Sequence, residues 1–233
     1  MPRLPQSYTI AFSITLLVPT HGLAAGFVQS PAYIECSKLS TTSPSTALAK
    51  ADEWLKIDDS YSAHHCRAMA LFGMQRFTDA ADALELVRDK IPENDLTLQT
   101  YVTKQAATAW ESAGRSAAAL TTIGQQLTAM GKRKGANALV SKLSSDLLVA
   151  RAQIRIHYGQ RDEAMRDLDH AVSLTPINTD VLLARADLFQ QLGDTALATN
   201  DAQAVLTLDP KNEKAKALIA KLTATPTPEK AIP

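Results

Sequence analysis

Apolar and small residues recur at helical spacing in the second half of the chain, and the pattern itself repeats. The sequence Leu-Leu-Val-Ala-Arg-Ala at 147–152 is followed by Val-Leu-Leu-Ala-Arg-Ala at 181–186, so that the two Ala-Arg-Ala triplets lie 34 residues apart. Gly159 and Gly193 share the same offset. Several matching features at one offset indicate a tandem repeat of a structural unit.

Each 34-residue unit is predicted to contain two helices. The first helix ends at Gly159 or Gly193, because glycine readily adopts the positive φ that ends many helices. The second helix stops before Pro176 or Pro210, since proline lacks the N–H that a further helical turn needs. Alanines such as Ala152 recur where two helices would approach closely. The pattern therefore predicts an all-α protein built from antiparallel helix pairs.

These residues resemble the tetratricopeptide repeat family. When the units are numbered from Ser145 and from Thr179, small residues fall at positions 8 and 20, glycine at 15 and proline at 32. Val205 departs from the small residue of position 27, and Arg155 replaces an expected aromatic residue at position 11. The resemblance implies helix pairs stacked as a right-handed α-solenoid, in which each unit contacts only its neighbours.

The resemblance extends upstream with weaker matches and gives four units within a repeat domain at 45–222. In the second unit, Trp110 and Gly114 match positions 11 and 15. The segment 213–222 carries an apolar stripe and is predicted to be the capping helix that a repeat array needs at its end. The four units are expected at 61–94, 100–133, 145–178 and 179–212.

The regions that flank these units are predicted to differ from the repeat. The Ser/Thr/Pro-rich segment 26–44 is expected to be irregular, and Ala47 to Asp58 resembles a lone second helix. About 11 extra residues precede Ser145 and are expected to interrupt the array. The tail 223–233 holds three prolines and few apolar residues, a composition typical of disorder.

The N-terminus has the three parts of a secretory signal peptide. Arg3 is followed by an apolar run at 9–18, then by Pro19 and small residues at 22–26. This pattern predicts a cleaved signal peptide at 1–25 and a periplasmic or secreted protein with no stable membrane span. The alternative is an uncleaved anchor, for which the apolar run is short.

Export affects how the two cysteines are interpreted. In an oxidising compartment, an even pair such as Cys36 and Cys66 favours a disulfide over a metal site. The bond would join the N-terminal segment to the first helix of the array, and two separate thiols are the alternative. The adjacent run His64-His65-Cys66 could suggest a metal, but consecutive helical residues point about 100° apart and converge poorly on one ion. We therefore predict no metal site and no cofactor.

Charge and motifs exclude several classes of function. Lys plus Arg and Asp plus Glu both number 24, which argues against a protein specialised for nucleic acid or for anionic membranes. The one dense basic run, at 131–135, is either a solvated loop or a contact for an acidic partner or phospholipid headgroups. The sequence has no phosphate loop, nucleophile elbow or zinc-protease helix, and a catalytic role is therefore not expected.

Arginine at position 7 and aspartate at position 23 recur in the last two units. They are predicted to form charge-assisted pairs between the helices of a unit, a structural role rather than a ligand site. Arg67 lacks this partner, and Asp79 or Asp82 could substitute for it. The predicted pairs are Arg151 with Asp167 and Arg185 with Asp201.

The resemblance also implies a binding face. In the family, the first helices line the concave side and contact partners through a few exposed positions. The carboxylate clamp of chaperone-binding members is not matched, because Thr108 stands where that clamp has asparagine. The corresponding residues here are His65, Met69, Phe72, Tyr101, Lys104, Thr108, Glu111, Gln153, His157, Asp187 and Gln190.

These observations predict a protein-protein interaction scaffold of the cell envelope that holds a peptide or helix of a partner protein. Two other hypotheses remain open at this point. One is a periplasmic chaperone or assembly factor for envelope proteins, and the other is an accessory subunit of an envelope enzyme complex.

Overall fold

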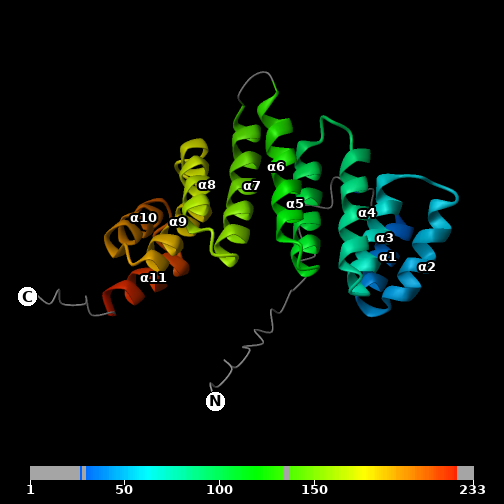
Figure 1. Ribbon diagram of the computed structural model, residues 1–233, viewed down its shortest axis with the longest axis horizontal. Helices are drawn as coiled ribbons and strands as arrows, with labels where there is room; N and C mark the ends of the chain where they lie inside the picture. The colour runs from blue at the N-terminus through cyan, green and yellow to red at the C-terminus, as the bar shows by residue number, and fades with distance from the viewer. Residues whose placement is uncertain (1–26, 28–29, 134–136, 225–233) are drawn as a thin grey trace, which may run out of the picture.

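The computed structural model describes residue 27 and residues 30–133 and 137–224. These residues form eleven helices and no strand. Figure 1 shows the helices stacked side by side in a curved row, from α1 and α2 at one end to α11 at the other. The helices are α1 (Pro31–Thr42), α2 (Pro44–Leu55), α3 (Tyr61–Gly73), α4 (Phe77–Lys90), α5 (Leu96–Ser112), α6 (Ser116–Gly131), α7 (Ala138–His157), α8 (Arg161–Leu174), α9 (Thr179–Leu192), α10 (Thr195–Leu208) and α11 (Glu213–Ala224).

The predicted helix pairs and their stop signals are confirmed. The four units correspond to α3/α4, α5/α6, α7/α8 and α9/α10, and α11 packs on α10 at the end of the array. Gly114, Gly159 and Gly193 each adopt a positive φ, between 72° and 85°, where a first helix turns into its second. In the first unit Gln75 takes that place with φ 59°. The turn geometry is thus repeated even where glycine is missing.

Alanines allow the helices of each pair to pack closely. Ala152, Ala164, Ala186 and Ala198 are fully buried. One large apolar cluster runs from Phe27 through the first two units into α7, and smaller clusters follow in the last two units and the capping helix.

The prediction of an irregular segment at 26–44 is wrong, because residues 31–42 form helix α1. The Ser30 hydroxyl caps this helix by accepting a hydrogen bond from the Tyr33 amide at 3.2 Å, and Pro31 is favourable in the first turn. The helix also packs tightly on α3, where a Cβ at Gly73 would collide with the main-chain oxygen of Ser40. The helix over 44–55 is consequently not alone but forms a pair with α1.

The extra residues before Ser145 do not form a separate irregular insert. Most of them extend the first helix of the third unit, because α7 already begins at Ala138. The Asn137 side chain caps α7 by accepting from the Val140 amide at 2.8 Å, and Leu143 is buried. This first helix is therefore longer than its counterparts.

Both predicted terminal segments fall largely beyond the described part of the chain. The expected signal peptide at 1–25 lies outside it, as does the tail from residue 225 onward. The start of that tail, up to Ala224, belongs to α11. Within the described ranges, no helix is long and apolar enough to cross a membrane.

Candidate functional site

The first helices of the units lie on the inner side of the curved array. Helix α5 contacts α7, α7 contacts α9, and α9 contacts α11, in addition to the contacts inside each pair. Among the described helices, no comparable contacts join α4 to α6 or α6 to α8. The surface that α3, α5, α7 and α9 present on the inner side is called the first-helix face below.

The predicted contact residues differ widely in exposure along this face. Those in the middle and C-terminal parts of the array reach solvent, and those toward the N-terminal end are packed. The exposed residues are Lys104, Thr108, Gln153, His157 and Asp187. The half-buried residues are Met69, Phe72, Tyr101, Glu111 and Gln190, and His65 is buried.

His65 is not available to a partner, so its assignment as a contact residue is wrong. Its side chain lies under Phe27, with the two ring centroids 4.1 Å apart, and only 1% of the residue is exposed. Nε2 donates to Oε1 of Gln105 at 2.8 Å, and Nδ1 accepts from the Tyr33 hydroxyl at 2.9 Å. Both ring nitrogens of a neutral imidazole are thereby satisfied.

The polar network around His65 continues to Tyr101. Nε2 of Gln105 donates to the Tyr101 hydroxyl at 3.2 Å, and burial raises the pKa of Tyr101. Phe27 and Tyr33 come from outside the repeat, stack at 5.3 Å and close this end of the first-helix face. The repeat pattern in the sequence did not predict that Phe27, Tyr33 and Gln105 would cluster around His65.

Acidification is expected to destabilise the protein through His65. Burial lowers its pKa from 6.5 to about 4, so as the pH falls the unfolded chain takes up this proton before the folded chain does. The contribution of neutral His65 to the free energy of unfolding is therefore fully present above pH 6.5. It is lost between pH 6.5 and 4, by up to about 3 kcal/mol. Urea unfolding at a series of pH values would measure the loss.

The matched controls are His65→Gln and His170→Gln, since His170 is exposed on α8. The His65 variant should be less stable at pH 7.5 and should lose less stability on acidification than the wild type. The His170 variant should keep the wild-type pH dependence. Equal pH dependence in all three proteins would contradict the assignment.

The middle of the face brings α5 and α7 together. Burial raises the pKa of the Glu111 carboxyl, and the nearby His157 opposes that rise. Phe72 instead packs inside its own unit, edge-on against Phe77 with ring centroids 5.1 Å apart. Phe72 therefore contributes to the unit's packing, and only part of its surface is available for binding.

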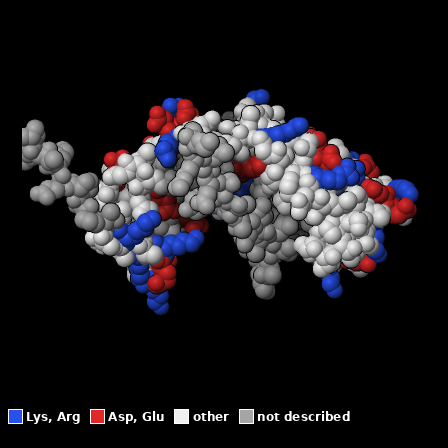
Figure 2. Space-filling model, turned by 60° about the horizontal axis from the view of Figure 1, so that its bottom comes forward, with Lys and Arg blue, Asp and Glu red and all other residues white. Residues whose placement is uncertain are grey.

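The C-terminal end of the face includes residues of the capping helix. Burial raises the pKa of Asp187, and Lys221 and Lys214 of α11 oppose that rise. The Lys221 ammonium also donates to Oε1 of Gln190 at 3.3 Å. Figure 2 shows basic side chains gathered at this end of the molecule. The sequence pattern assigned α11 only a capping role and did not identify these lysines as part of the face.

The predicted arginine-aspartate pairs are confirmed. Arg151 binds the Asp167 carboxylate with two hydrogen bonds, of 2.9 and 2.6 Å, and Arg185 binds Asp201 with two, of 2.8 and 2.9 Å. The Asp201 carboxylate raises the pKa of Arg185. Arg155, which replaces the expected aromatic residue, also donates to Asp167 at 2.6 Å. These pairs join the two helices of a unit and do not form a ligand site.

Arg67 has a different partner from the two that were predicted. Its Nε donates to Asp52 of α2, the preceding second helix, at 3.0 Å, whereas Asp79 bonds with Arg76. Arg185 makes the equivalent contact with Asp169 of α8 at 2.9 Å. The arginine at position 7 can thus join its unit to the unit before it.

The run His64-His65-Cys66 sends its side chains to three separate partners. His64 contacts Asp59 at 2.5 Å, His65 lies in the network described above, and Cys66 forms a disulfide with Cys36. The Cα atoms of the two cysteines are 5.9 Å apart, and the bond joins α1 to α3. Within the described ranges, no three His, Cys, Asp or Glu side chains are placed to hold a metal ion.

Comparison with known proteins identifies the fold. No protein-family model matches the sequence, and no curated protein matches it. Among solved structures, MamA from Desulfovibrio magneticus RS-1 is similar over 80% of this chain and 99% of its own, with a TM-score of 0.53 and 13% identity.

Two further structures are similar at the same level. A tetratricopeptide repeat protein from Parabacteroides merdae matches 71% of this chain and 61% of its own, with a TM-score of 0.53 and 20% identity. YrrB, described as a tetratricopeptide repeat protein with an unusual peptide-binding site, matches 82% of this chain and 90% of its own, with a TM-score of 0.51 and 15% identity. The helical array in the described part of this chain therefore has the tetratricopeptide repeat fold.

Proposed function

We propose that this chain is a non-enzymatic interaction scaffold of the cell envelope that binds an extended or helical segment of a partner protein on its first-helix face. One observation carries the proposal: Lys104, Gln153 and Asp187 are exposed on three successive first helices. The side chains of Lys104 and Gln153 make no hydrogen bond or ion pair with another described residue. A row of such groups along a repeat array suits a segment that runs across several units.

Two further observations support a binding role. The described residues group no three potential metal ligands, and the buried carboxylates of Asp167 and Asp201 are engaged in structural pairs. YrrB, whose fold is similar, is described as having a peptide-binding site. A peptide on the first-helix face would meet polar groups from the middle unit onward, beyond the closed end at His65.

The envelope location rests on two features of the N-terminal part of the chain. Residues 1–25 have the order of a signal peptide, and the Cys36–Cys66 disulfide suits an oxidising compartment. Both cysteines are buried, so the bond belongs to the packing of α1 on α3. Cell fractionation should recover the mature chain from the periplasm or the medium.

A triple substitution on the first-helix face is expected to abolish capture of the partner without unfolding the protein. Lys104→Glu, Gln153→Ala and Asp187→Lys change exposed groups on three helices and leave the net charge unchanged. The wild-type protein, expressed in its own host and cross-linked, should capture one dominant stoichiometric partner, and the triple variant should capture at least tenfold less. Quantitative mass spectrometry of the captured proteins would measure the difference.

The matched control carries the same kinds of change on exposed residues of second helices: Asp82→Lys, Arg166→Glu and Gln203→Ala. This control should retain the partner. Equal capture by all three proteins would rule out the first-helix face as the binding site. Capture of many weakly bound proteins would instead favour the chaperone hypothesis.

A further inference from the structure

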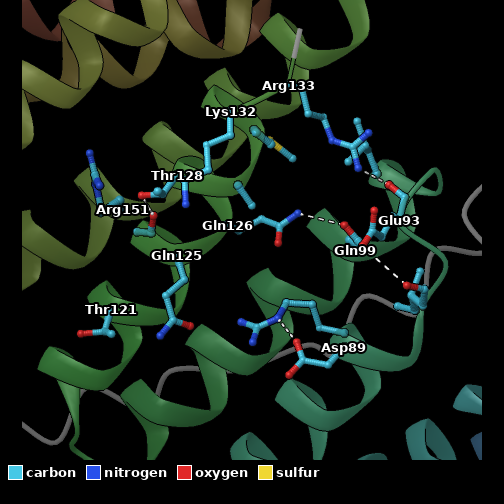
Figure 3. Close-up of a pocket in the computed structure, with 16 residues that line it drawn as sticks. Asp89, Glu93, Gln99, Thr121, Gln125, Gln126, Thr128, Lys132, Arg133 and Arg151 are labelled. Atoms are coloured by element: carbon cyan, nitrogen blue, oxygen red, sulfur yellow. Dashed lines mark hydrogen bonds and ion pairs between the residues drawn. The ribbon is translucent and has the colours of Figure 1, made fainter.

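A polar groove lies on the opposite side of the array, between the second helices α4 and α6. Its volume is about 1210 Å³, larger than the roughly 300–1,000 Å³ of most small-molecule sites. The start of α5 lines the groove, as do the chain that follows α6 and Arg151 of α7 (Figure 3). It is called the second-helix groove below. The second helices α4 and α6 both pack on α5 and have no comparable contact with each other, which leaves space between them.

The helix α6 presents small and polar side chains to this groove. Thr121, Gln125 and Thr128 follow one another at the three- and four-residue spacing of a single helix face, and Lys132 continues this spacing directly after the helix ends. Gly124 lies on the same side, and because it has no side chain the groove stays open beside Arg151. No aromatic side chain lines the groove, so it offers no platform for stacking a nucleic-acid base or a sugar ring.

The cations of the groove exceed its carboxylates. Arg88, Lys132, Arg133 and Arg151 line it together with two acidic residues, Asp89 and Glu93, and Arg151 is already neutralised by Asp167 outside the groove. Arg133 donates to the main-chain oxygen of Glu93, and Lys132 pairs with no described residue. Lys132 and Arg133 therefore have no carboxylate partner among the described residues.

One buried donor in the groove lacks an acceptor. The Arg88 side chain is 13% exposed, and its Nε donates to Asp89 at 2.9 Å. Its Nη1 is buried and makes no hydrogen bond to any described residue. A buried guanidinium N–H without a partner is costly, and an acceptor supplied from outside would remove that cost.

We propose that the second-helix groove binds an extended acidic segment of a protein partner, with Asp or Glu carboxylates near Arg88, Lys132 and Arg133. Carboxylates match Lys132 and Arg133, which have no described carboxylate partner, and the Arg88 Nη1 that makes no hydrogen bond although Nε of Arg88 pairs with Asp89. The exposed Gln125 amide can bond with the main chain of an extended segment. This site is independent of the first-helix face and would let the array hold two partners at once. It lies on the side of the array opposite the row formed by Lys104, Gln153 and Asp187.

The test uses a fluorescein-labelled octapeptide of alternating Glu and Ser, with a Gln–Ser octapeptide as the neutral control. Fluorescence anisotropy should show saturable binding of the acidic peptide to the full mature chain at 50 mM salt, at least tenfold tighter than the neutral peptide. Lys132→Gln with Arg133→Gln, both exposed, should weaken binding by tenfold or more, because each charge-assisted contact accounts for about a factor of ten. Arg88→Gln should weaken it similarly, with the fold checked by circular dichroism.

The charge-matched control is Lys38→Gln with Lys211→Gln, two exposed lysines far from the groove in sequence. This control should bind the acidic peptide as the wild type does. Amide chemical-shift changes on peptide addition should cluster at Thr121, Gln125 and Thr128.

Four outcomes would overturn the proposal. They are no saturable binding, equal weakening in the charge-matched control, shift changes on the first-helix face instead, or equally tight binding of an eight-nucleotide oligothymidylate. The last result would assign the groove to polyanions in general. Failure here would leave the first-helix-face experiment unaffected, because the two sets of variants share no residue.

Discussion

Replacing Asp167 with alanine is expected to lower the free energy of unfolding by about 3 kcal/mol. The side chain of Asp167 is 5% exposed and is the common acceptor for Arg151 and Arg155, whose side chains are 21% and 22% exposed. Its removal leaves two guanidinium groups between α7 and α8 without their carboxylate. The partial exposure of both arginines allows some rehydration, which places the expected loss at the lower end of the range for broken buried pairs.

Urea denaturation followed by far-UV circular dichroism would measure the change. Asp146→Asn is the matched control, because it removes a carboxylate that pairs with Lys142 on the solvent side of the same unit. That exposed pair should contribute no more than about 0.5 kcal/mol.

A triple variant distinguishes the cost of losing the ion pairs from the cost of leaving the two arginine charges unpaired. Replacing Arg151, Arg155 and Asp167 together by Met, Phe and Leu should recover most of the lost stability, since no charge is then left unpaired. Phenylalanine suits position 155 because Phe189 occupies the equivalent position of the next unit. If Asp167→Ala and Asp146→Asn cost the same, the Asp167 cluster has no special structural role.

Removing the Cys36–Cys66 bond is expected to lower the free energy of unfolding by about 3–4 kcal/mol. The bond closes a loop across a sequence separation of 30 residues, and the chain-entropy model gives this value for the freedom regained by the unfolded chain. The double substitution to alanine would test it. The two cysteines are buried in a small cluster with Ala47, Ala51 and Ala70, so the effect should be concentrated in α1, α2 and α3.

Hydrogen exchange would locate this loss. Amides of α1 and α2 should exchange faster in the double variant, whereas those of α9 and α10 should keep their protection, because units of an array contact only their neighbours. Trp54 packs against the cysteine cluster, and its fluorescence in a Trp110→Phe background would report on the same region. Unchanged protection of α1 would mean that helix packing alone holds it on α3.

Much of this architecture was determined by local sequence signals. The glycine that ends the first helix in three units, the proline after the second helix in three units and the buried alanines all act over a few residues. Gln75 takes the place of the glycine in the first unit, and the second unit lacks the proline. The pairs Arg151–Asp167 and Arg185–Asp201 were predictable because both partners recur at one offset within a unit. The disulfide could be predicted from the even number of cysteines together with the predicted signal peptide.

Other features depended on contacts that no local signal encodes. Helix α1 was missed because its Ser- and Thr-rich sequence is a weak helix former, and packing on α3 together with the disulfide stabilises it. His65 occupies a position that is exposed in a regular array, yet Phe27 and Tyr33 cover it from outside the repeat. Arg67 paired with Asp52 because its neighbour in space is the preceding second helix.

The first-helix face could be predicted from the sequence, whereas the second-helix groove could not. The sequence by itself determined which helix faces repeat along the array, and hence where Lys104, Gln153 and Asp187 lie. Only the tertiary structure decided that α4 and α6 do not pack against each other and leave a polar groove containing Arg88 and Arg133, which lie 45 positions apart in the chain. Helical periodicity fixes the side of a helix on which a residue lies, whereas the space between two helices depends on how the whole array packs.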